Sequence, residues 1–325
     1  MNTKIKKIGI LTSGGDAPGM NAVIRAVTRT ALYYGIEVVG IKRGYEGLLH
    51  AEIVDLKARG VSEILQRGGT ILLTARSEEM KTPEGQKRAA DICNVLGIDA
   101  LVVIGGDGSI NGAIKLAGLG IKVMAVPATI DLDIPCSEYT IGFDTAVTTV
   151  MNAIGKIRDT SSSHERCSIV EVMGRNAGHI AYWCALTGGA EDVVVPEHKK
   201  EDYPGSIIKQ ILENRSKGKT HNLIIVAEGV GGSQQLAAQI EEMTGISSRA
   251  TILGHLQRGG SPTVVDRMHA SIMGHNVVKM LLEGLENRIV IYKGGRYSSV
   301  PLEDVNQEPT KANVGLYDII KILAI

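Results

Sequence analysis

The stretch 101–135 constrains the fold more than any other part of the chain, because it contains two apolar runs that each end in a polar turn. The first run, Leu101 to Ile104, leads into Gly105-Gly106-Asp107-Gly108-Ser109 and then into a helical pattern. The second run, Val123 to Val126, ends in Thr129-Ile130-Asp131-Leu132-Asp133. Strand, glycine turn and helix in this order are the repeating unit of a mostly parallel α/β sheet. Ligands of such sheets bind beyond the carboxyl ends of the strands, where both turns would lie.

Two aspartates in these turns indicate the chemistry of the site. Asp107 follows the first predicted strand and Asp131 follows the second. A glycine turn that opens a helix presents backbone N–H groups to an anion, and a carboxylate can bind a metal ion or accept a proton. A phosphate site, a metal ligand and a base would therefore lie at one sheet edge, which suits phosphoryl transfer.

Each aspartate also has a simpler interpretation. By itself Asp107 fits a helix N-cap as well as a metal ligand. The presence of a second polar turn with Asp131, at the end of the next predicted strand, favours the interpretation as a metal ligand. Asp131 and Asp133 lie two residues apart in a loop. That spacing by itself favours hydrogen bonds that stabilise a turn. The residues of the two turns alone leave these alternatives open.

The composition excludes several classes of protein. Lys and Arg together number 35, as do Asp and Glu, so the net charge of zero does not indicate a nucleic-acid or membrane surface. The apolar runs are too short to span a membrane, and the polar start MNTKIKK lacks the apolar region of a signal peptide. The four cysteines are scattered without metal-binding spacing, which predicts free thiols in a reducing cytoplasm.

The rest of the chain continues the alternation of strand and helix. A strand predicted at 8–12 ends in Gly14-Gly15-Asp16 and precedes a helix over 20–34, and further elements are predicted at 38–41 and 83–96. After a long predicted helix over 144–158, a second series of strands is predicted at 168–172, 193–195, 223–227 and 250–253. From about residue 262 a long helix leads to a charged, glycine-containing tail. The length of 325 residues and the change near residue 142 predict two domains.

Cations accompany the second series of strands, and several of them lie at predicted strand ends. They are Arg166, Arg175 in the stretch Met173-Gly174-Arg175, Arg249, His255 and Arg258. Because an arginine fork matches phosphate oxygens, the group is typical of a sugar-phosphate site, with Glu228 as an acceptor for sugar hydroxyls. Taken singly, each arginine is better explained as a surface residue, and Glu228 also fits an ordinary turn acid. No P-loop motif and no G-x-G-x-x-G after a strand is present, which argues against a P-loop enzyme and a nicotinamide cofactor.

Seven stretches of the sequence, taken together, resemble the bacterial 6-phosphofructokinases. They are IGILTSGGDAPGMNAVIR (8–25), ALVVIGGDGS (100–109), PATIDLDI (127–134), TIGFDTA (140–146), IRDTSSSHER (157–166), VEVMGRNAGH (170–179) and ATILGHLQRGGSP (250–262). The turn GGDG alone has little specificity, because lipid and NAD kinases carry a similar one. The ordered set is very specific and extends over the chain from residue 8 to about residue 275.

The resemblance implies an α/β fold of two Rossmann-like, three-layer α/β/α domains with mostly parallel sheets. We predict an ATP-binding domain from residues 1–142 and 257–307, and a fructose 6-phosphate-binding domain from 143–256 and 308–325. The chain would cross between the domains, because Arg258 and Asp131 must face one cleft although they lie far apart in sequence.

The resemblance also implies a glycolytic kinase that transfers the γ-phosphate of ATP to the 1-hydroxyl of D-fructose 6-phosphate, with Mg²⁺ as the cofactor. Asp131 would be the base and Asp107 the metal ligand, and the catalytic group would include Gly14, Thr129 and Arg175. ATP would be bound by Gly14, Arg76, Gly106, Asp107, Gly108 and Ser109. Fructose 6-phosphate would be bound by Thr129, Asp131, Arg166, Met173, Gly174, Arg175, Glu228, Arg249, His255 and Arg258.

In this family the equivalents of Arg166 and Arg249 reach across from a neighbouring subunit. The resemblance therefore implies a cytoplasmic homotetramer with shared active sites. It also implies an allosteric site for ADP or phosphoenolpyruvate at another interface. The positions that match this effector site are Arg25, Arg29, Arg158, Gly189, Glu191, Lys217, Lys219 and His221.

Three residues depart from the family pattern. Leu132 stands where the family usually has Asn, and Ala128 stands where it usually has Gly. These two changes bear on kinetic constants rather than on the reaction, because neither removes a charged group. Glu52 stands where some relatives carry an arginine, and a carboxylate there would repel an anionic effector.

Two other functions compete with the ATP-dependent kinase. A pyrophosphate-dependent phosphofructokinase would carry Asp in place of the Gly after the Asp of the GGDG turn and Lys before Thr129, whereas Gly108 and Ala128 are small and neutral here. A phosphosugar-binding subunit without catalysis would be expected to lack Asp131 or Asp107, and both are present. The sequence therefore favours the ATP-dependent enzyme.

Overall fold

The computed structural model describes residues 5–198, 202–305 and 310–324. The chain divides into two compact units, which are treated separately below. The first unit is Met1–Thr145 with Arg258–Pro309, and the second is Ala146–Gln257 with Thr310–Ile325. The boundaries expected from the sequence were after residues 142, 256 and 307. The assignment of ATP to the first unit and of fructose 6-phosphate to the second stays a prediction.

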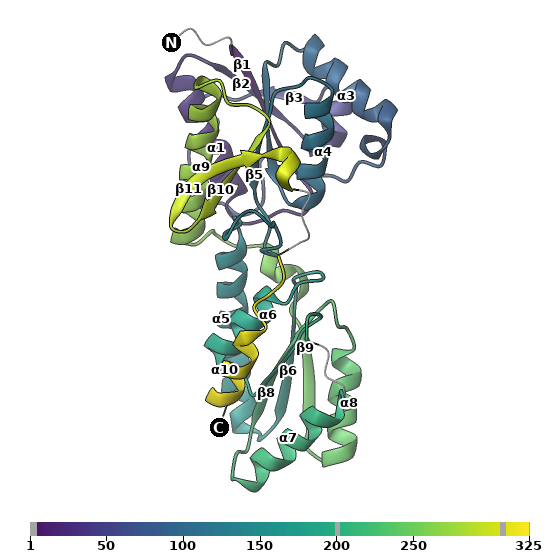
Figure 1. Ribbon diagram of the computed structural model, residues 1–325. Coiled ribbons are helices and arrows are strands. Elements are labelled where there is room, and N and C mark those ends of the chain that lie inside the picture. The colour runs from purple at the N-terminus through teal and green to yellow at the C-terminus, as the bar shows by residue number, and fades with distance from the viewer. Residues whose placement is uncertain (1–4, 199–201, 306–309, 325) are drawn as a thin grey trace. The chain divides into compact units, whose positions relative to one another are not determined.

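The first unit is built on a seven-stranded sheet with the strand order β11-β10-β5-β4-β1-β2-β3 (Figure 1). The five strands from β10 to β2 pair in parallel, and β11 and β3 add antiparallel edges. The strands are β1 (Lys7–Ser13), β2 (Glu37–Ile41), β3 (Ile53–Asp55), β4 (Ala100–Gly105), β5 (Val123–Pro127), β10 (Arg288–Lys293) and β11 (Arg296–Pro301).

Helices cover both faces of this sheet. Figure 1 shows α1 and α9 on one side and α3 and α4 on the other. The helices of the unit are α1 (Met20–Tyr33), α2 (Gly44–Leu49), α3 (Pro83–Val95), α4 (Asp107–Gly118) and α9 (Val264–Leu282), with short 3₁₀ turns η1 (Glu79–Lys81) and η3 (Leu302–Val305). All residues of β4 and β5 are buried, as expected for parallel strands with helices on both faces.

The second unit contains a four-stranded sheet, β7-β8-β6-β9, in which all neighbours are parallel. The strands are β6 (Cys167–Val172), β7 (Asp192–Val194), β8 (Asn222–Ala227) and β9 (Ser248–Ile252). The helices are α5 (Phe143–Ser163), which contains the boundary between the units, α6 (His179–Gly188), α7 (Gly205–Ser216), α8 (Ser233–Thr244) and α10 (Gly315–Leu323), and the 3₁₀ turn η2 is Gly254–Arg258. The predicted α/β fold class with mostly parallel sheets is confirmed.

The tail of the chain contains structure that the sequence did not predict. It was expected to be a charged, glycine-containing tail, but β10 and β11 form a hairpin that extends the first sheet next to β5. Gly294 and Gly295 connect the two strands, with φ of 57° and 75°. Two consecutive positive φ values match the right-handed twist of a tight hairpin, and glycine adopts them without strain.

The four cysteines are free, and three of them, Cys93, Cys167 and Cys184, are buried. Burial raises the pKa of each of these three thiols to about 12, so they are protonated and unreactive at neutral pH. The prediction of free thiols is confirmed, and the cytoplasmic location inferred from it stays a prediction. Within the described ranges, no helix combines the length and the apolar character needed to cross a bilayer.

Candidate active site

Three polar turns follow neighbouring strands of the first sheet. Strand β4 pairs with β1 on one side and with β5 on the other, and its last residue, Gly105, lies opposite Ser13 and Pro127. The turns after these strands, at 14–16, 106–109 and 128–133, therefore lie side by side at the carboxyl edge of the sheet. This is the arrangement that the alternation of strands and turns predicted.

The first of these turns packs closely against Arg258. Gly14 has a φ of 83°, which favours glycine. A side chain at Gly15 would place its Cβ only 2.4 Å from Nη1 of Arg258, and this nitrogen donates a hydrogen bond to the Asp16 carbonyl at 3.0 Å. Arg258 is thereby held at the same sheet edge as the other turns, although it lies more than two hundred residues along the chain from the turn that holds it.

The second turn opens α4 and leaves its first backbone N–H groups without a side-chain cap, because the N-cap residue is Gly106. Asp107 is the first residue of the helix and is not its N-cap, which removes the simpler interpretation of this aspartate. Its side chain is exposed, and its Oδ1 accepts a hydrogen bond from Nδ2 of Asn111 at 3.1 Å. Open N–H groups and the positive end of the helix dipole would stabilise a phosphate here.

Close packing fixes the path of this glycine turn. A Cβ on Gly105 would lie 2.5 Å from Oγ of Ser109 and 2.5 Å from the Ser13 carbonyl oxygen, so the position requires glycine. Tyr45, which is buried, donates a hydrogen bond to the Ser109 carbonyl at 2.6 Å. By contrast, a Cβ on Gly108 would meet no atom within 4 Å, so the turn is open on its outer side.

The third turn carries Asp131, which is 3% exposed. The Asp131 backbone N–H donates to Oγ1 of Thr129 at 3.2 Å, which fixes the start of the turn. Leu132 follows with a φ of 56°, a left-handed conformation that Asn adopts more readily than a branched apolar residue. The departure from the family at this position therefore places the strained residue directly beside the candidate base.

Arg76 lies in an irregular segment that reaches the first turn. Oγ1 of Thr74 donates to the Gly14 carbonyl at 2.7 Å, and Oγ1 of Thr12 donates to the Leu73 carbonyl at 2.8 Å. The Arg76 side chain is exposed, two residues beyond the first of these contacts. The segment thus brings a cation near the glycine turns without burying its charge.

The carboxylates of this edge fit a magnesium site completed by the substrate. In the part of the chain that the structure describes, no group of three His, Cys, Asp or Glu side chains is placed to hold a metal ion. Mg²⁺, however, usually keeps several waters and is held by one or two carboxylates together with substrate phosphates. The exposed Asp107 carboxylate, beside open N–H groups suited to a phosphate, meets that requirement.

In the second unit, four predicted sugar-phosphate residues lie at the carboxyl edge of the sheet. Strands β6 and β8 are neighbours, so Met173, Gly174 and Arg175 follow one strand and Glu228 follows the other. The Arg175 backbone N–H donates to Oε1 of Glu228 at 2.9 Å. Gly174 has a φ of 136°, and a Cβ there would lie 2.4 Å from the Ala177 carbonyl oxygen. The two strand ends are therefore bound to each other.

Gln257 is a structural residue of this edge that was not singled out from the sequence. It is fully buried, its Oε1 accepts from the Met173 backbone N–H at 3.1 Å, and its Nε2 donates to the Gly254 carbonyl at 3.1 Å. It thereby binds the end of β6 to η2, which carries the exposed His255. The motif GHLQRGG contained Gln257, but only the contact reveals its role.

Arg166 and Arg249 lie at the other edge of the same sheet. Arg166 immediately precedes β6, and Arg249 is the second residue of β9, opposite Ser168 in the pairing of β6 and β9. A six-residue strand is about 16 Å from its first to its last Cα, so this edge is well separated from Arg175 and Glu228. Within the second unit, the structure thus divides the predicted substrate residues into two groups. Arg249 is bound to Glu241 at 3.1 Å and to the Ser248 carbonyl at 2.8 Å.

Most of the predicted effector residues lie together in the second unit. Arg158 donates to the carbonyls of Gly188 and Gly189. Glu191, 2% exposed, forms an ion pair with Nζ of Lys219 at 2.8 Å, and the same nitrogen donates to the Ala324 carbonyl at 2.8 Å. Lys217, exposed, and His221, partly buried, lie on the segment between α7 and β8.

The remaining predicted effector residues, Arg25 and Arg29, are one turn apart on α1 in the first unit. Burial, and then the charge of Arg29, lower the pKa of Arg25, as expected for two cations on one helix face. Glu52 differs from the free carboxylate assumed from the sequence, because Arg43 binds both of its oxygens. The Arg43 hydrogen bond is also the main reason that the pKa of Glu52 is lowered. Its negative charge is therefore largely neutralised by Arg43, which weakens the repulsion expected from the sequence.

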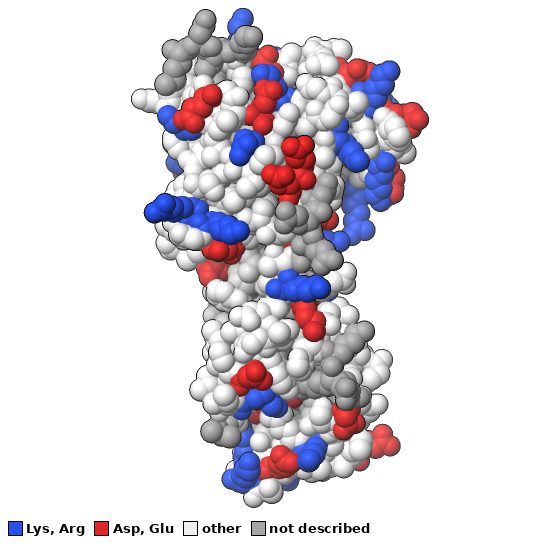
Figure 2. All heavy atoms as spheres, in the orientation of Figure 1, with Lys and Arg blue, Asp and Glu red and all other residues white. Residues whose placement is uncertain are grey.

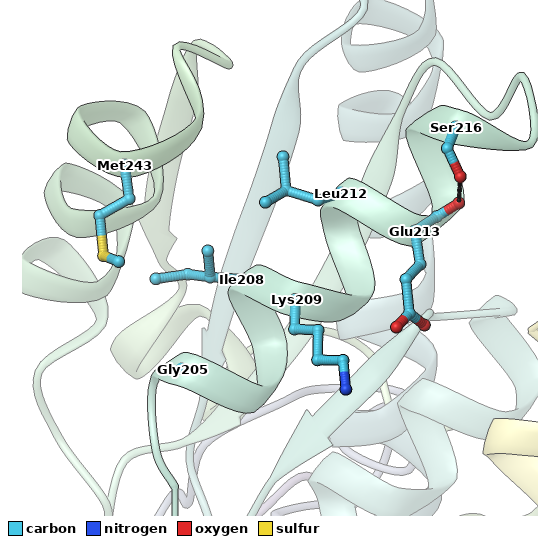
Figure 3. A pocket seen from close by; sticks show the side chains of 7 residues that line it. All are labelled: Gly205, Ile208, Lys209, Leu212, Glu213, Ser216 and Met243. Atoms are coloured by element: carbon cyan, nitrogen blue, oxygen red, sulfur yellow. Dashed lines mark hydrogen bonds between the residues drawn. The ribbon is translucent and has the colours of Figure 1, made fainter.

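An open hollow of about 430 Å³ lies between α7 and α8 in the second unit (Figure 3). Ile208, Leu212 and Met243 give it an apolar lining, with Lys209 as its one cation among the lining residues. None of the predicted site residues lines it. Figure 2 shows cations and anions interspersed on the visible surface, in keeping with the equal numbers of the two.

Comparisons with known proteins agree with this structure. Glycine turns and acidic side chains at the carboxyl edge of a parallel sheet define an α/β protein of the phosphate-binding kind. A family model described as phosphofructokinase matches residues 7–281. The chain therefore belongs to the phosphofructokinase family.

Individual relatives extend the match to nearly the whole chain. Two proteins named ATP-dependent 6-phosphofructokinase, from Clostridium botulinum (strain Hall) and Clostridium tetani, are 52% and 54% identical to this chain over 320 residues. Each match covers 98% of this chain and 100% of the relative. A solved structure of phosphofructokinase from Saccharomyces cerevisiae is 33% identical, with a TM-score of 0.84. That match covers 92% of this chain and 45% of the yeast chain, so the chain spans less than half of its yeast relative.

Proposed function

We propose that this chain is an ATP-dependent 6-phosphofructokinase, which transfers the γ-phosphate of ATP to the 1-hydroxyl of fructose 6-phosphate. The observation that carries the proposal is the position of Asp131, buried at the end of β5 beside the turn that opens α4 with Asp107. The proposed base and the proposed metal-binding carboxylate then follow adjacent strands of one sheet. The near-complete match to relatives of that name supports the same activity.

The turns of the first unit would bind the nucleotide. Uncapped N–H groups at the start of α4 would donate to phosphate oxygens, with Gly14 and Ser109 fixing the two turns and Arg76 adding a positive charge. Asp107 would hold Mg²⁺, which when bound neutralises charge on the phosphates. The chain's own contribution is to place donors and charges in advance of the reaction.

Asp131 would accept the proton of the attacking hydroxyl. As the bond from the sugar oxygen to the γ-phosphorus forms, the bond from that phosphorus to the bridging oxygen of ADP breaks, and the hydroxyl proton moves to the carboxylate. Thr129 fixes the Asp131 backbone through its hydroxyl, which keeps the carboxylate in place. Burial also limits competing proton exchange with water.

We propose that the residues that bind the sugar phosphate are Met173, Gly174, Arg175, Glu228, His255, Arg258 and Thr129. Arg166 and Arg249 lie at the opposite edge of the second sheet from Arg175. This separation supports the proposal that they serve the site of another copy of the chain in a homotetramer.

The choice of ATP over pyrophosphate rests on the space beside the glycine turn. Nothing lies within 4 Å of the position that a side chain at Gly108 would take. That open space suits the larger nucleotide, and the small Ala128 at the end of β5 adds no charge. A phosphosugar-binding subunit without catalysis is disfavoured, because both carboxylates are in place.

A coupled assay with fructose 6-phosphate tests this proposal directly. We expect turnover with ATP and Mg²⁺, and at most a trace when pyrophosphate replaces ATP. Asp131→Ser protein, purified in the same way, is the control for a contaminating kinase. Activity that comes from this chain must decrease with that substitution, whereas the activity of a contaminant would not. Turnover with pyrophosphate but not with ATP would mean that pyrophosphate is the phosphoryl donor. Binding of fructose 6-phosphate without turnover would indicate a subunit without catalysis.

We further propose that the cations at the predicted effector positions bind ADP or phosphoenolpyruvate and thereby regulate the enzyme. Lys217 is exposed, and Lys219 lies two residues further along the same segment. Binding of either ligand should weaken at least tenfold in Lys217→Ala, measured by calorimetry. The exposed Lys209, on the neighbouring helix α7 but outside the predicted set, provides the matched control as Lys209→Ala. Unchanged binding in Lys217→Ala and Arg25→Ala would place regulation elsewhere.

A further inference from the structure

The segment 139–145, which follows the turn of the candidate base and includes the first residues of α5, is bound by a single buried carboxylate. We refer to this segment as the loop 139–145. Asp266, fully buried in the first turn of α9, accepts hydrogen bonds on Oδ1 from the Tyr139 hydroxyl and the Gly142 backbone N–H, each at 2.6 Å. Its Oδ2 accepts from the Thr145 backbone N–H at 2.9 Å and from the Thr145 hydroxyl. All four donors come from this one loop.

This concentration of donors fixes the loop tightly. A buried carboxylate is costly unless its oxygens are fully hydrogen-bonded, so each of the four bonds stabilises one loop conformation. Gly142 has a φ of 108°, and a Cβ there would lie 2.7 Å from Cβ of Ala17. Gly19 is equally close to the loop, because a Cβ on it would lie 2.5 Å from Cγ2 of Ile141. The loop is thus held between the turn after β1 and the start of α9.

The same loop holds the segment that leads to Asp131. Oγ1 of Thr140, which is fully buried, donates to the Thr129 carbonyl at 2.7 Å. The Ile141 backbone N–H donates to the Pro127 carbonyl at 3.0 Å, and Ile141 forms a parallel bridge with Ala128. The loop therefore lies along β5 beyond its last residue, in the place of an added strand.

We infer that Thr140 is a positioning residue for the base, and that Asp266 is the anchor through which it acts. The inference rests on the proposed role of Asp131. The chain of hydrogen bonds runs from Asp266 to the loop, from Thr140 to the Thr129 carbonyl, and from the Asp131 backbone N–H to the Thr129 hydroxyl. A displacement of the base by about 1 Å can lower the rate as much as ~10²-fold, so this support affects catalysis as well as stability.

Thr140→Val tests the inference, because valine keeps the shape of the side chain and removes the hydroxyl. We expect kcat to fall by roughly 10- to 100-fold, with the KM for ATP nearly unchanged. The matched control is Thr28→Val in α1, since Thr28 is also fully buried but its hydroxyl has no hydrogen-bond partner among the described residues. Thr140→Ser, which keeps the hydroxyl, should recover most of the lost kcat.

A double-mutant cycle separates positioning from a general structural role. In an Asp131→Ser background, Thr140→Val should have little further effect on the residual kcat, because no base remains to be placed. Tyr139→Phe, which removes one bond to Asp266, should show the same dependence on Asp131 with a smaller effect. If Thr140→Val does not fold, the Tyr139→Phe cycle carries the test.

The outcomes distinguish this inference from the proposed function. If Asp131→Ser lowers kcat but the effect of Thr140→Val is absent or fully additive to it, the positioning role is wrong and the proposed base stands. If Asp131→Ser retains normal kcat, the proposed base and the inference that rests on it are both wrong. The positioning role is supported if the losses in kcat from Asp131→Ser and Thr140→Val are not additive, if Thr140→Ser recovers kcat, and if Thr28→Val shows no loss of kcat.

Discussion

At the scale of single residues, the two candidate carboxylates differ in their surroundings. Asp107 is exposed at the start of a helix, where a metal ion with its waters can reach it. Asp131 is 3% exposed, in a turn that is held by a hydrogen bond from its backbone N–H to the Thr129 hydroxyl. Exposure suits a ligand of a hydrated ion, and burial suits a base that must meet one substrate proton. The two residues are therefore expected to respond differently to substitution.

Asp131→Ser should lower kcat by ~10²–10⁴-fold, the usual contribution of a general base, with a small change in the KM for fructose 6-phosphate. Loss confined to kcat is the pattern of an interaction made mainly in the transition state. Steady-state kinetics with both substrates varied provides the measurement. If kcat stays near normal, the base lies elsewhere and Asp133 becomes the first candidate.

Asp107→Ala should lower activity in a way that added Mg²⁺ partly restores, because the substitution removes a ligand of the metal and leaves the base intact. Assays of Asp107→Ala and Asp131→Ser over a range of Mg²⁺ concentrations compare the two roles. Rescue of Asp131→Ser but not of Asp107→Ala would mean that the roles are reversed.

Leu132→Asn should stabilise the protein by about 1 kcal/mol, because Leu132 has a left-handed φ of 56° that Asn adopts at lower cost. Denaturant unfolding of the wild type and the variant gives the comparison. Leu119→Asn is the control, since Leu119 is a leucine outside the core with an ordinary φ of −96°. An equal or smaller gain at position 132 than at position 119 would contradict the strain argument.

At the scale of elements, the site depends on turns that pack against distant segments. Gly15 lies under the guanidinium of Arg258, and Gly105 lies against both Ser109 and Ser13. At Gly105 the Ser13 backbone leaves no room for a Cβ, so packing there requires glycine. At Gly15 the neighbour is the end of a long side chain, which an added Cβ would push aside. The glycine turns therefore position side chains in addition to leaving N–H groups open.

Gly15→Ala should displace Arg258, because the added Cβ would lie 2.4 Å from Nη1. We expect the KM for fructose 6-phosphate to rise about tenfold, the effect of losing one charge-assisted hydrogen bond, with a smaller change for ATP. Gly118→Ala at the end of α4 is the control, since a Cβ there meets nothing within 4 Å and should leave kinetics unchanged. A larger rise in the KM for ATP would assign Arg258 to the nucleotide instead.

At the scale of the whole molecule, the placement of Arg166 and Arg249 bears on assembly. They lie at the amino edge of the second sheet, whereas Arg175 and Glu228 lie at its carboxyl edge. Side chains at opposite ends of parallel strands cannot meet one small sugar phosphate in the same unit. The two groups are therefore expected to contact ligands of different copies of the chain.

Mixing inactive variants tests whether sites are shared. Hybrids of Arg249→Ala and Asp131→Ser subunits should recover part of the activity, because some sites then combine an intact arginine from one subunit with an intact base from another. Subunit exchange is followed by native mass spectrometry, and a mixture of Asp131→Ser with itself provides the baseline. Exchange without any recovery would show that each site is built from one chain.

The sequence by itself determined the local units and the order in which they occur. Apolar runs that end in polar turns placed Asp107 and Asp131 after β4 and β5, because strand period, turn residues and helix starts are properties of short segments. The positions of β6 and β8 were also predicted to within a residue. The family motifs added the candidate site on top of this pattern.

Only the tertiary structure decided which of these segments lie together. The pairing of β10 with β5, the contact of Arg258 with the first turn, and the four bonds from the loop 139–145 to Asp266 all join residues more than one hundred positions apart. Such contacts form because packing of the sheet and its helices brings the segments together, and no short stretch of sequence contains that information. Leu132 shows the same limit on a smaller scale, since its strain arises from a turn whose path is set by its neighbours in space.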